Sequence, residues 1–339
     1  MRTWLRHRRW LTASILGVLA TMVGMQSANA ATPTPPGQPS SGYGSTANYI
    51  ATSATRYETG NGSDGTRVWW FVPNRLRNGS SAPVVVFLHG FMLLAPDIYQ
   101  GHIDHLTKQG FIVIYPQFNK GGITGLISDT DQRAMLQRAI DATNVALGRL
   151  DARADRGQLH LYGHSLGGLM GAAWLGAGGP AVRSITLANP SIDPAGAIPS
   201  FVRSFVKITP IDYAALAPAT RVRTVILTGD SDTIAQPTES VALWRALTNA
   251  PDKVVYQASS DSHGSPALAA DHMAPIQNQG WVPDFMMKLF GGVGRQDTLD
   301  WRYYYAALDS NIAGTTRVPF DLGRWSDGVP VAAPVELAR

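Results

Sequence analysis

Short, almost continuously apolar runs alternate with longer amphipathic stretches along most of the chain. The clearest of these runs are VVVFL, FIVIY and TVIL, and such runs are typical of strands that are covered on both faces. Strands are predicted at residues 67–72, 84–88, 111–115, 158–162, 183–188, 222–228 and 253–258. Their alternation with helical stretches predicts an α/β fold, in which a mostly parallel sheet carries helices on both faces.

The stretches between these strands repeat their apolar residues at helical spacing. The clearest helix is predicted at residues 131–150, and others at residues 98–109, 166–175, 237–248 and 298–312. Two longer segments, residues 189–220 and 264–295, fit no regular element. Both are rich in apolar residues, which argues against disorder and favours a functional excursion from the sheet.

The first 30 residues have the composition of a secretory signal peptide. Four arginines and no acidic residue precede an apolar run that reaches about residue 25, and the segment closes on Ala28-Asn29-Ala30, a cleavage-site pattern. The apolar run is too short for a good membrane span. We therefore expect secretion to the periplasm or the extracellular space, with cleavage near Ala30 and no integral membrane association of the mature chain.

Removing this segment changes the charge of the protein. The whole chain has 28 basic and 24 acidic residues, but four arginines lie within residues 1–30, so the mature chain is formally neutral. A neutral chain gives no argument for a nucleic-acid partner. Cysteine is absent, which excludes thiolate nucleophiles, disulfides and zinc–thiolate sites.

These patterns divide the chain into four parts. Residues 1–30 are the predicted signal peptide, and residues 31–47, rich in Pro, Gly, Ser and Thr, are predicted to form a disordered spacer. Residues 48–315 are predicted to form one catalytic domain that includes both apolar excursions. Residues 316–339 follow as a C-terminal tail.

The segment Gly163-His164-Ser165-Leu166-Gly167 matches the pattern G-x-S-x-G between a predicted strand and a predicted helix. A sharp turn from strand to helix exposes the serine hydroxyl and places it at the positive end of the helix dipole. The alternative is a glycine-rich turn that only connects the two elements. Because the strand and the helix are both predicted, Ser165 is favoured as a nucleophile.

A serine nucleophile needs a base, and in this type of fold the base follows the nucleophile and the acid along the chain. Only His263 and His272 follow Ser165. His263 lies in the polar segment SSDSHG, directly after the last strong strand, from which it could reach back over the sheet. His263 is therefore the predicted base, and His272, nine residues further on, is the alternative.

The acid is expected at the end of a strand between these residues. The segment VILTGDSD offers Asp230 and Asp232 after a buried strand. Asp232 is favoured because the short turn lets its carboxylate point along the edge of the sheet, whereas Asp230 is expected to stabilise the turn. Asp193 and Asp212 are more distant candidates.

An oxyanion hole requires two preset hydrogen-bond donors. The N–H of Leu166 follows the nucleophile and is one of them. The loop after the strand VVVFL supplies the second, with the N–H of Phe91 as the predicted donor and that of Met92 in reserve. His89 precedes this loop and is expected to be a buried structural histidine that fixes it.

Taken together, these motifs resemble the α/β-hydrolase superfamily. FLHGFMLLAPDIYQGHIDHLTKQGFIVIYPQF is similar to a stretch of the chlorophyllases, and GHSLGG to the corresponding turn of lipases and of the cutinase-like polyester hydrolases. LTGDSDTIAQP and SSDSHG resemble the acid-bearing and base-bearing segments of the polyester hydrolases. The resemblance implies Asp232 as the acid, His263 as the base and an esterase or lipase activity.

Two other patterns invite a ligand-binding interpretation. Residues 60–65 spell G-x-G-x-x-G, but they precede a strand, so a hairpin turn is predicted instead of a dinucleotide site. His102 and His105 would share one face of a helix, but no third ligand is apparent. A solvated helix surface is predicted there, and no metal is expected.

The sequence therefore predicts a secreted serine hydrolase of a hydrophobic carboxylic ester, acting through an acyl-enzyme on Ser165. Two alternatives stay open: an acyltransferase with the same acyl-enzyme, and a non-catalytic binding module on a hydrolase scaffold. The expected partner is a small-molecule, lipid or polymer ester, without a cofactor. Fold alone does not choose among these esters.

Overall fold

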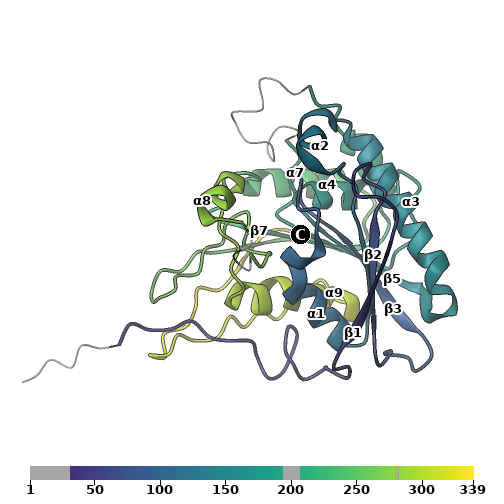
Figure 1. Ribbon diagram of the computed structural model, residues 1–339. Coiled ribbons are helices and arrows are strands. Elements are labelled where there is room, and N and C mark those ends of the chain that lie inside the picture. The colour runs from purple at the N-terminus through teal and green to yellow at the C-terminus, as the bar shows by residue number, and fades with distance from the viewer. Residues whose placement is uncertain (1–30, 194–206, 279, 281) are drawn as a thin grey trace, which may run out of the picture. The chain divides into compact units, whose positions relative to one another are not determined.

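A central sheet organises the protein in the computed structural model, which describes residues 31–193, 207–278, 280 and 282–339 (Figure 1). Its strand order over the described residues is β1-β2-β4-β3-β5-β6-β7-β8-β9. The strands from β3 to β8 are parallel to one another, whereas β1, β2 and β9 are each antiparallel to their neighbours. The strands are β1 (Ala54–Thr59), β2 (Val68–Pro73), β3 (Ala82–Leu88), β4 (Ile112–Pro116), β5 (Ala154–His164), β6 (Ser184–Ala188), β7 (Arg223–Gly229), β8 (Lys253–Ala258) and β9 (Val335–Ala338).

The mostly parallel sheet predicted from the sequence is confirmed, and all seven predicted strands are present. The hairpin predicted at residues 60–65 is confirmed too, because it joins the antiparallel strands β1 and β2. The hydrophobic pattern does not predict β1 or β9. Most of β1 is exposed and β9 has four residues, so neither strand carries the apolar signature of a buried strand.

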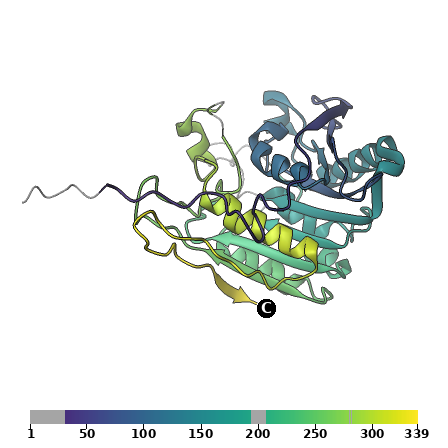
Figure 2. The same ribbon diagram turned by 90° about the horizontal axis from the view of Figure 1, so that it is seen from below.

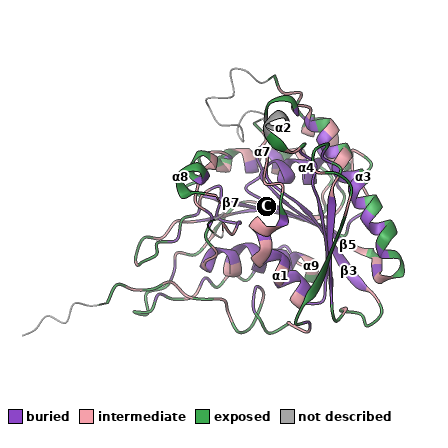
Figure 3. Ribbon diagram, in the orientation of Figure 1, coloured by how far each residue is buried: buried purple, intermediate pink, exposed green. Residues whose placement is uncertain are grey.

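Helices cover both faces of the sheet, as predicted. Along β3, Val84 and Val86 belong to the same buried cluster as apolar residues of α3, α4 and α7, whereas Val85 and Phe87 point to the opposite face and belong to the cluster that includes residues of α1 and α9. Figure 1 shows the two sets of helices, and Figure 3 shows the central strands buried between them. The helices are α1 (Gln100–Lys108), α2 (Gly122–Ser128), α3 (Gln132–Leu150), α4 (Leu166–Ala173), α6 (Tyr213–Leu216), α7 (Pro237–Ala246), α8 (Asp284–Met287) and α9 (Ala306–Ala313).

The two histidines of α1 are buried, so the predicted solvated surface is wrong. The ring of His102 stacks on Tyr305, and His105 is hydrogen bonded to the carboxylate of Asp309. These partners come from a helix about two hundred residues away, and the sequence pattern of α1 alone does not reveal them. Among the described residues, no group of three His, Asp or Glu side chains is arranged to hold a metal ion.

The predicted disordered spacer is wrong over most of residues 33–47. Main-chain carbonyls of this segment accept hydrogen bonds from the C-terminal part of the chain, and Figure 2 shows the two running side by side. The composition suggests disorder because the segment has little apolar surface to bury. It does not reveal that the main-chain carbonyls, including those of the prolines, can still accept hydrogen bonds from the rest of the protein. The bonds join Ser265 to Pro33 at 2.8 Å, Ser326 to Thr34 at 3.0 Å and Arg302 to Gly37 at 2.8 Å.

The C-terminal tail is part of the same fold. β9 extends the sheet by pairing with β8, and the side chain of Trp325 is 1% exposed. The indole N–H of Trp325 donates to Asp261 in the loop after β8, at 3.1 Å. The predicted signal peptide lies outside the described residues, and so do residues 194–206 of the first excursion. Within the described residues, no helix has the length and apolarity needed to cross a membrane.

Candidate active site

Ser165 occupies a sharp turn between β5, which ends at His164, and α4, which begins at Leu166. Its φ of 56° lies in the left-handed region, a strained conformation for a residue with a side chain. Only glycine fits at the two flanking positions. A Cβ on Gly163 would lie 2.2 Å from the carbonyl oxygen of Gly167, and a Cβ on Gly167 would lie 2.3 Å from that of Leu88. The strand–turn–helix geometry predicted for this motif is confirmed.

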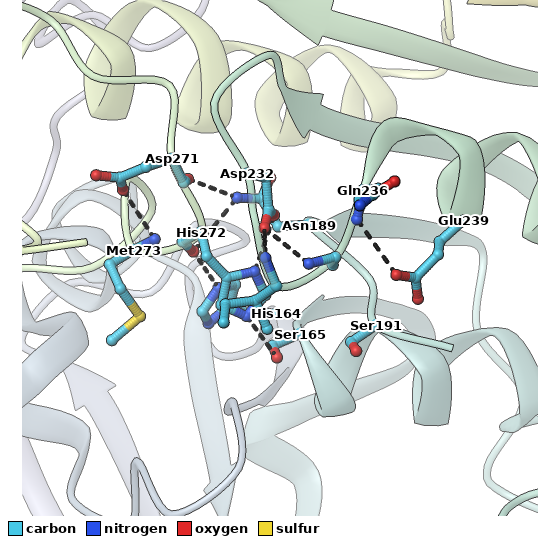
Figure 4. Close-up of polar contacts among 12 residues, drawn as sticks. His164, Ser165, Asn189, Ser191, Asp232, Gln236, Glu239, Asp271, His272 and Met273 are labelled. Carbon is cyan, nitrogen blue, oxygen red and sulfur yellow. Dashed lines mark hydrogen bonds and ion pairs between the residues drawn. The ribbon is translucent and has the colours of Figure 1, made fainter. Parts of the chain in front are cut away.

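His272, and not His263, lies beside the serine. The Nε2 atom of His272 is 2.8 Å from Ser165 Oγ, and its Nδ1 atom is 2.8 Å from Asp232 Oδ2 (Figure 4). A carboxylate only accepts hydrogen bonds, so Nδ1 carries the proton and the bare Nε2 accepts from the serine hydroxyl. All three side chains are buried. The structure therefore joins Ser165, His272 and Asp232 in one hydrogen-bonded chain.

The prediction that His263 faces Ser165 is wrong. His263 is exposed, and its Nε2 atom bonds to Asp327 in the C-terminal tail at 2.7 Å. Its loop is fixed there because Asp261 binds the indole of Trp325 and the N–H of Ala332. The chain then returns to the sheet, where the carbonyl of Ala270 accepts from the N–H of Ser231 at 3.1 Å, and the next residues reach Ser165.

The carboxylate of Asp232 is held at both oxygens, as expected of the favoured candidate. Its Oδ1 atom accepts from the N–H groups of Ile234 and Ala235 at 2.9 and 2.7 Å, which leaves Oδ2 to orient His272. Asp230 stabilises the neighbouring loop instead, by accepting from Ser260. The distant candidates are elsewhere: Asp212 caps α6, and the N–H of Asp193 donates to Glu239.

The two predicted oxyanion donors are free. Among the described residues, the N–H groups of Phe91 and Leu166 have no hydrogen-bond acceptor, whereas the reserve candidate Met92 donates to Asn119 at 3.2 Å. Gly90 packs against Ser165, since a Cβ there would lie 3.4 Å from Ser165 Cβ. Leu166 directly follows the serine and Phe91 lines the same narrow pocket as Ser165, whereas the amide of Met92 is already bonded.

His89 is the buried structural histidine that the sequence predicts. Its Nδ1–H donates to the carbonyl of Gly90 at 2.6 Å, and its ring stacks on Phe118. Burial lowers the pKa of His89 to about 3, so the ring is neutral at physiological pH. His89 therefore fixes the loop that carries the Phe91 amide.

Asn189 was not singled out by the sequence, yet it fixes the segment that carries His272. It follows β6 with a φ of 46°, a left-handed conformation that asparagine tolerates. Its side-chain amide donates to the carbonyl of Asp271 at 2.8 Å. Burial, together with the charge of Asp232, raises the pKa of Asp271 to about 6. An Asn directly after a strand, at the edge that holds the nucleophile, is the sequence signal for such a residue.

Two neighbouring apolar hollows lie at the candidate site, and one of them contains Ser165. A narrow pocket of about 10 Å³ contains Ser165 and His272, and it shares Phe91, Leu93 and Phe290 with a neighbouring cavity of about 390 Å³. The larger cavity is lined mostly by apolar side chains. The second excursion supplies four of them, as expected of it: Val282, Met286, Met287 and Phe290.

Comparison of the sequence with known protein families gives a match over part of the chain. A family model described as Chlorophyllase matches residues 71–218, which include β3, β5 and Ser165. No curated protein matches the sequence closely enough to count as a relative.

Solved structures with a similar chain path include peptidases and esterases. The acylaminoacyl peptidase of Pyrococcus horikoshii is 16% identical with a TM-score of 0.45, covering 62% of this chain and 37% of its own. Est1E from Butyrivibrio proteoclasticus is 16% identical with a TM-score of 0.44, covering 62% and 90%. The hyperthermophilic esterase of the archaeon Pyrobaculum calidifontis is 17% identical with a TM-score of 0.44, covering 63% and 78%. This chain thus spans less than half the length of the peptidase.

Proposed function

We propose that the chain belongs to the α/β-hydrolase superfamily and that it is a secreted serine hydrolase of hydrophobic carboxylic esters. The observation that carries the proposal is the hydrogen-bonded chain from Ser165 through His272 to Asp232. A base within 2.8 Å of a hydroxyl, oriented by a buried carboxylate, is the arrangement that activates a serine. The composition of residues 1–30 supports secretion.

The proposed reaction proceeds in two halves. Ser165 Oγ attacks the ester carbonyl carbon while His272 Nε2 takes the hydroxyl proton, and His272 then gives that proton to the leaving alcohol oxygen. This leaves the acyl group on Ser165. A water molecule, deprotonated by His272, next attacks the acyl carbon, the carboxylic acid leaves, and Ser165 recovers its proton. Asp232 keeps the imidazole oriented and stabilises its protonated form.

The free amides of Phe91 and Leu166 are proposed to bind the negative oxygen that forms in each half. Neither amide has an acceptor among the described residues, so each is preset for a charge that develops only during the reaction. Leu166 also begins α4, which directs the positive end of the helix dipole towards the same oxygen.

The larger cavity supports a hydrophobic ester as substrate. It adjoins the narrow pocket that contains Ser165, holds about 390 Å³ and is lined mainly by aliphatic side chains, methionine and phenylalanine. Burying apolar surface there would favour a substrate by about 0.8 kcal/mol per CH₂ group. An acyl or aryl group is therefore proposed to occupy it.

The proposal is tested with a fluorophosphonate probe and a panel of p-nitrophenyl esters of increasing chain length. The wild-type protein is expected to be labelled and to hydrolyse the esters, and Ser165→Ala is expected to lose both the label and the activity. A product analysis with an added alcohol separates hydrolysis from transfer, because hydrolysis yields the free acid. A wild-type protein that the probe does not label would contradict the proposal.

Filling the cavity is expected to change the chain-length preference. Val282→Trp places an indole against the apolar wall, so kcat/KM for long-chain esters should fall by about tenfold or more, while that for an acetate ester changes little. Phe285→Ala is the matched control, because Phe285 is 70% exposed and does not line the cavity. Equal losses on short and long esters would show that the acyl group binds elsewhere.

A further inference from the structure

Three hydrogen bonds connect the loop that carries the Phe91 amide, here called the oxyanion loop, to His272. They run through two buried side chains outside the triad. The N–H of Gly90 donates to Tyr99 Oη at 3.0 Å, and Tyr99 Oη lies 2.7 Å from His164 Nδ1. The Nε2 atom of His164 lies 2.9 Å from the carbonyl oxygen of His272. Tyr99 ends the short helix Pro96–Tyr99, and His164 ends β5.

The direction of each bond follows from the last acceptor. The carbonyl of His272 cannot donate, so His164 Nε2 must carry a proton. Burial holds the pKa of His164 well below its usual value, which keeps the ring neutral and leaves Nδ1 bare. Nδ1 therefore accepts from the hydroxyl of Tyr99, whose oxygen in turn accepts from Gly90. The direction of all three hydrogen bonds is therefore fixed: Gly90 donates to Tyr99, Tyr99 donates to His164, and His164 donates to His272.

The connection affects both the proposed oxyanion donor and the proposed base. Because the N–H of Gly90 is occupied by Tyr99, the next amide, that of Phe91, is the one left free in this loop, and Phe91 lines the same narrow pocket as Ser165. At the other end, His164 holds the main chain of the residue whose side chain meets the serine. His164 is also the residue directly before Ser165 in the sequence. The three bonds therefore connect the Gly90 loop to His272 through the residue next to the nucleophile.

We propose that Tyr99 and His164 are positioning residues that set the oxyanion donor and the base at a fixed separation across Ser165. This inference rests on the proposed ester hydrolysis. Neither side chain touches the reacting atoms in this role; each acts through a main-chain group of its neighbour. Small displacements of such groups cost large factors in rate, since a shift of about 1 Å can lower it about 10²-fold.

The first test compares two tyrosine variants. Tyr99→Phe removes the hydroxyl that joins Gly90 to His164, so kcat is expected to fall by about 10- to 100-fold with KM within about threefold of wild type. Tyr162→Phe is the matched control: its hydroxyl is equally buried on the same sheet face, but it has no hydrogen-bond partner among the described residues. It should keep wild-type kcat.

The second test separates the two bonds of His164. An asparagine at this position can still accept from Tyr99 but is too short to reach His272, whereas a glutamine can still donate towards that carbonyl. His164→Gln is therefore expected to retain more of kcat than His164→Asn. Combining Tyr99→Phe with His164→Asn should cost about as much as the worse single change, because both break one connection.

A readout without substrate distinguishes this inference from the proposed function. In ¹⁵N-histidine NMR of the whole protein, His164 is expected as the neutral Nε2–H form, with a slowly exchanging proton that exchanges faster in Tyr99→Phe. That result together with inactive wild-type protein would support the connection and refute ester hydrolysis. Wild-type activity with an unaffected kcat in Tyr99→Phe, an Nδ1–H form of His164, or additive losses in the double variant would each overturn the inference.

Discussion

His272→Ala is expected to lower kcat/KM for an activated ester by about 10⁴-fold or more, whereas His263→Ala should stay within about twofold of wild type. The difference follows from position. His272 Nε2 is 2.8 Å from Ser165 Oγ, while the ring of His263 bonds to Asp327 at the surface. Steady-state hydrolysis of a p-nitrophenyl ester by both variants measures the effect.

Thermal unfolding of the same two variants supplies the control. His263→Ala removes an exposed pair, which contributes little to stability, so its melting temperature should change little. If a folded His263→Ala variant loses activity as completely as Ser165→Ala, while His272→Ala stays active, the assignment of His272 as the base is wrong.

Gly167→Ala is expected to damage both stability and activity. Its Cβ would lie 2.3 Å from the carbonyl oxygen of Leu88 and 2.5 Å from that of His89, and neither main-chain group can move freely. We expect a loss of about 2 kcal/mol or more in the free energy of unfolding. The same displacement shifts the amide of Leu166, so kcat should fall by about 10²-fold or more.

Gly148→Ala is the matched control for this change. Gly148 lies on the exposed side of α3, and a Cβ there would meet nothing within 4 Å. Alanine in a helix interior is favoured over glycine by about 0.5 to 1 kcal/mol, so this variant should be more stable and fully active. Chemical denaturation measures both changes, and a Gly167→Ala variant as stable as wild type would contradict the tight fit at the turn.

The central strands and the sharp turn at Ser165 could be predicted because their signals are local. A buried strand needs a continuous apolar run, and the turn at Ser165 needs glycines within two residues of it, so both are visible in short stretches of sequence. Asp232 could be predicted for the same reason, since it follows the buried strand β7 by three residues. Each of these features depends on neighbours along the chain.

Which histidine lies beside Ser165 could not be predicted in this way, because the path of the chain there depends on distant partners. His263 follows a strand in a polar loop, but that loop is held by Trp325 through Asp261, which lies outside any local pattern. One local cue did distinguish the two histidines. His263 is flanked by Ser262 and Gly264, typical of a surface turn, whereas His272 follows Asp271 and precedes the apolar stretch MAPI.

The anchoring of the loop after β8 has a consequence for the order in which the protein matures. The loop is held by Trp325 and Pro33, and the segment that follows it carries His272. Trp325 is synthesised after every residue of the triad, so a growing chain would hold the nucleophile and the acid before it can fix the base. The proposed activity at Ser165 would thus require that Trp325 has been made, although the triad residues all precede it.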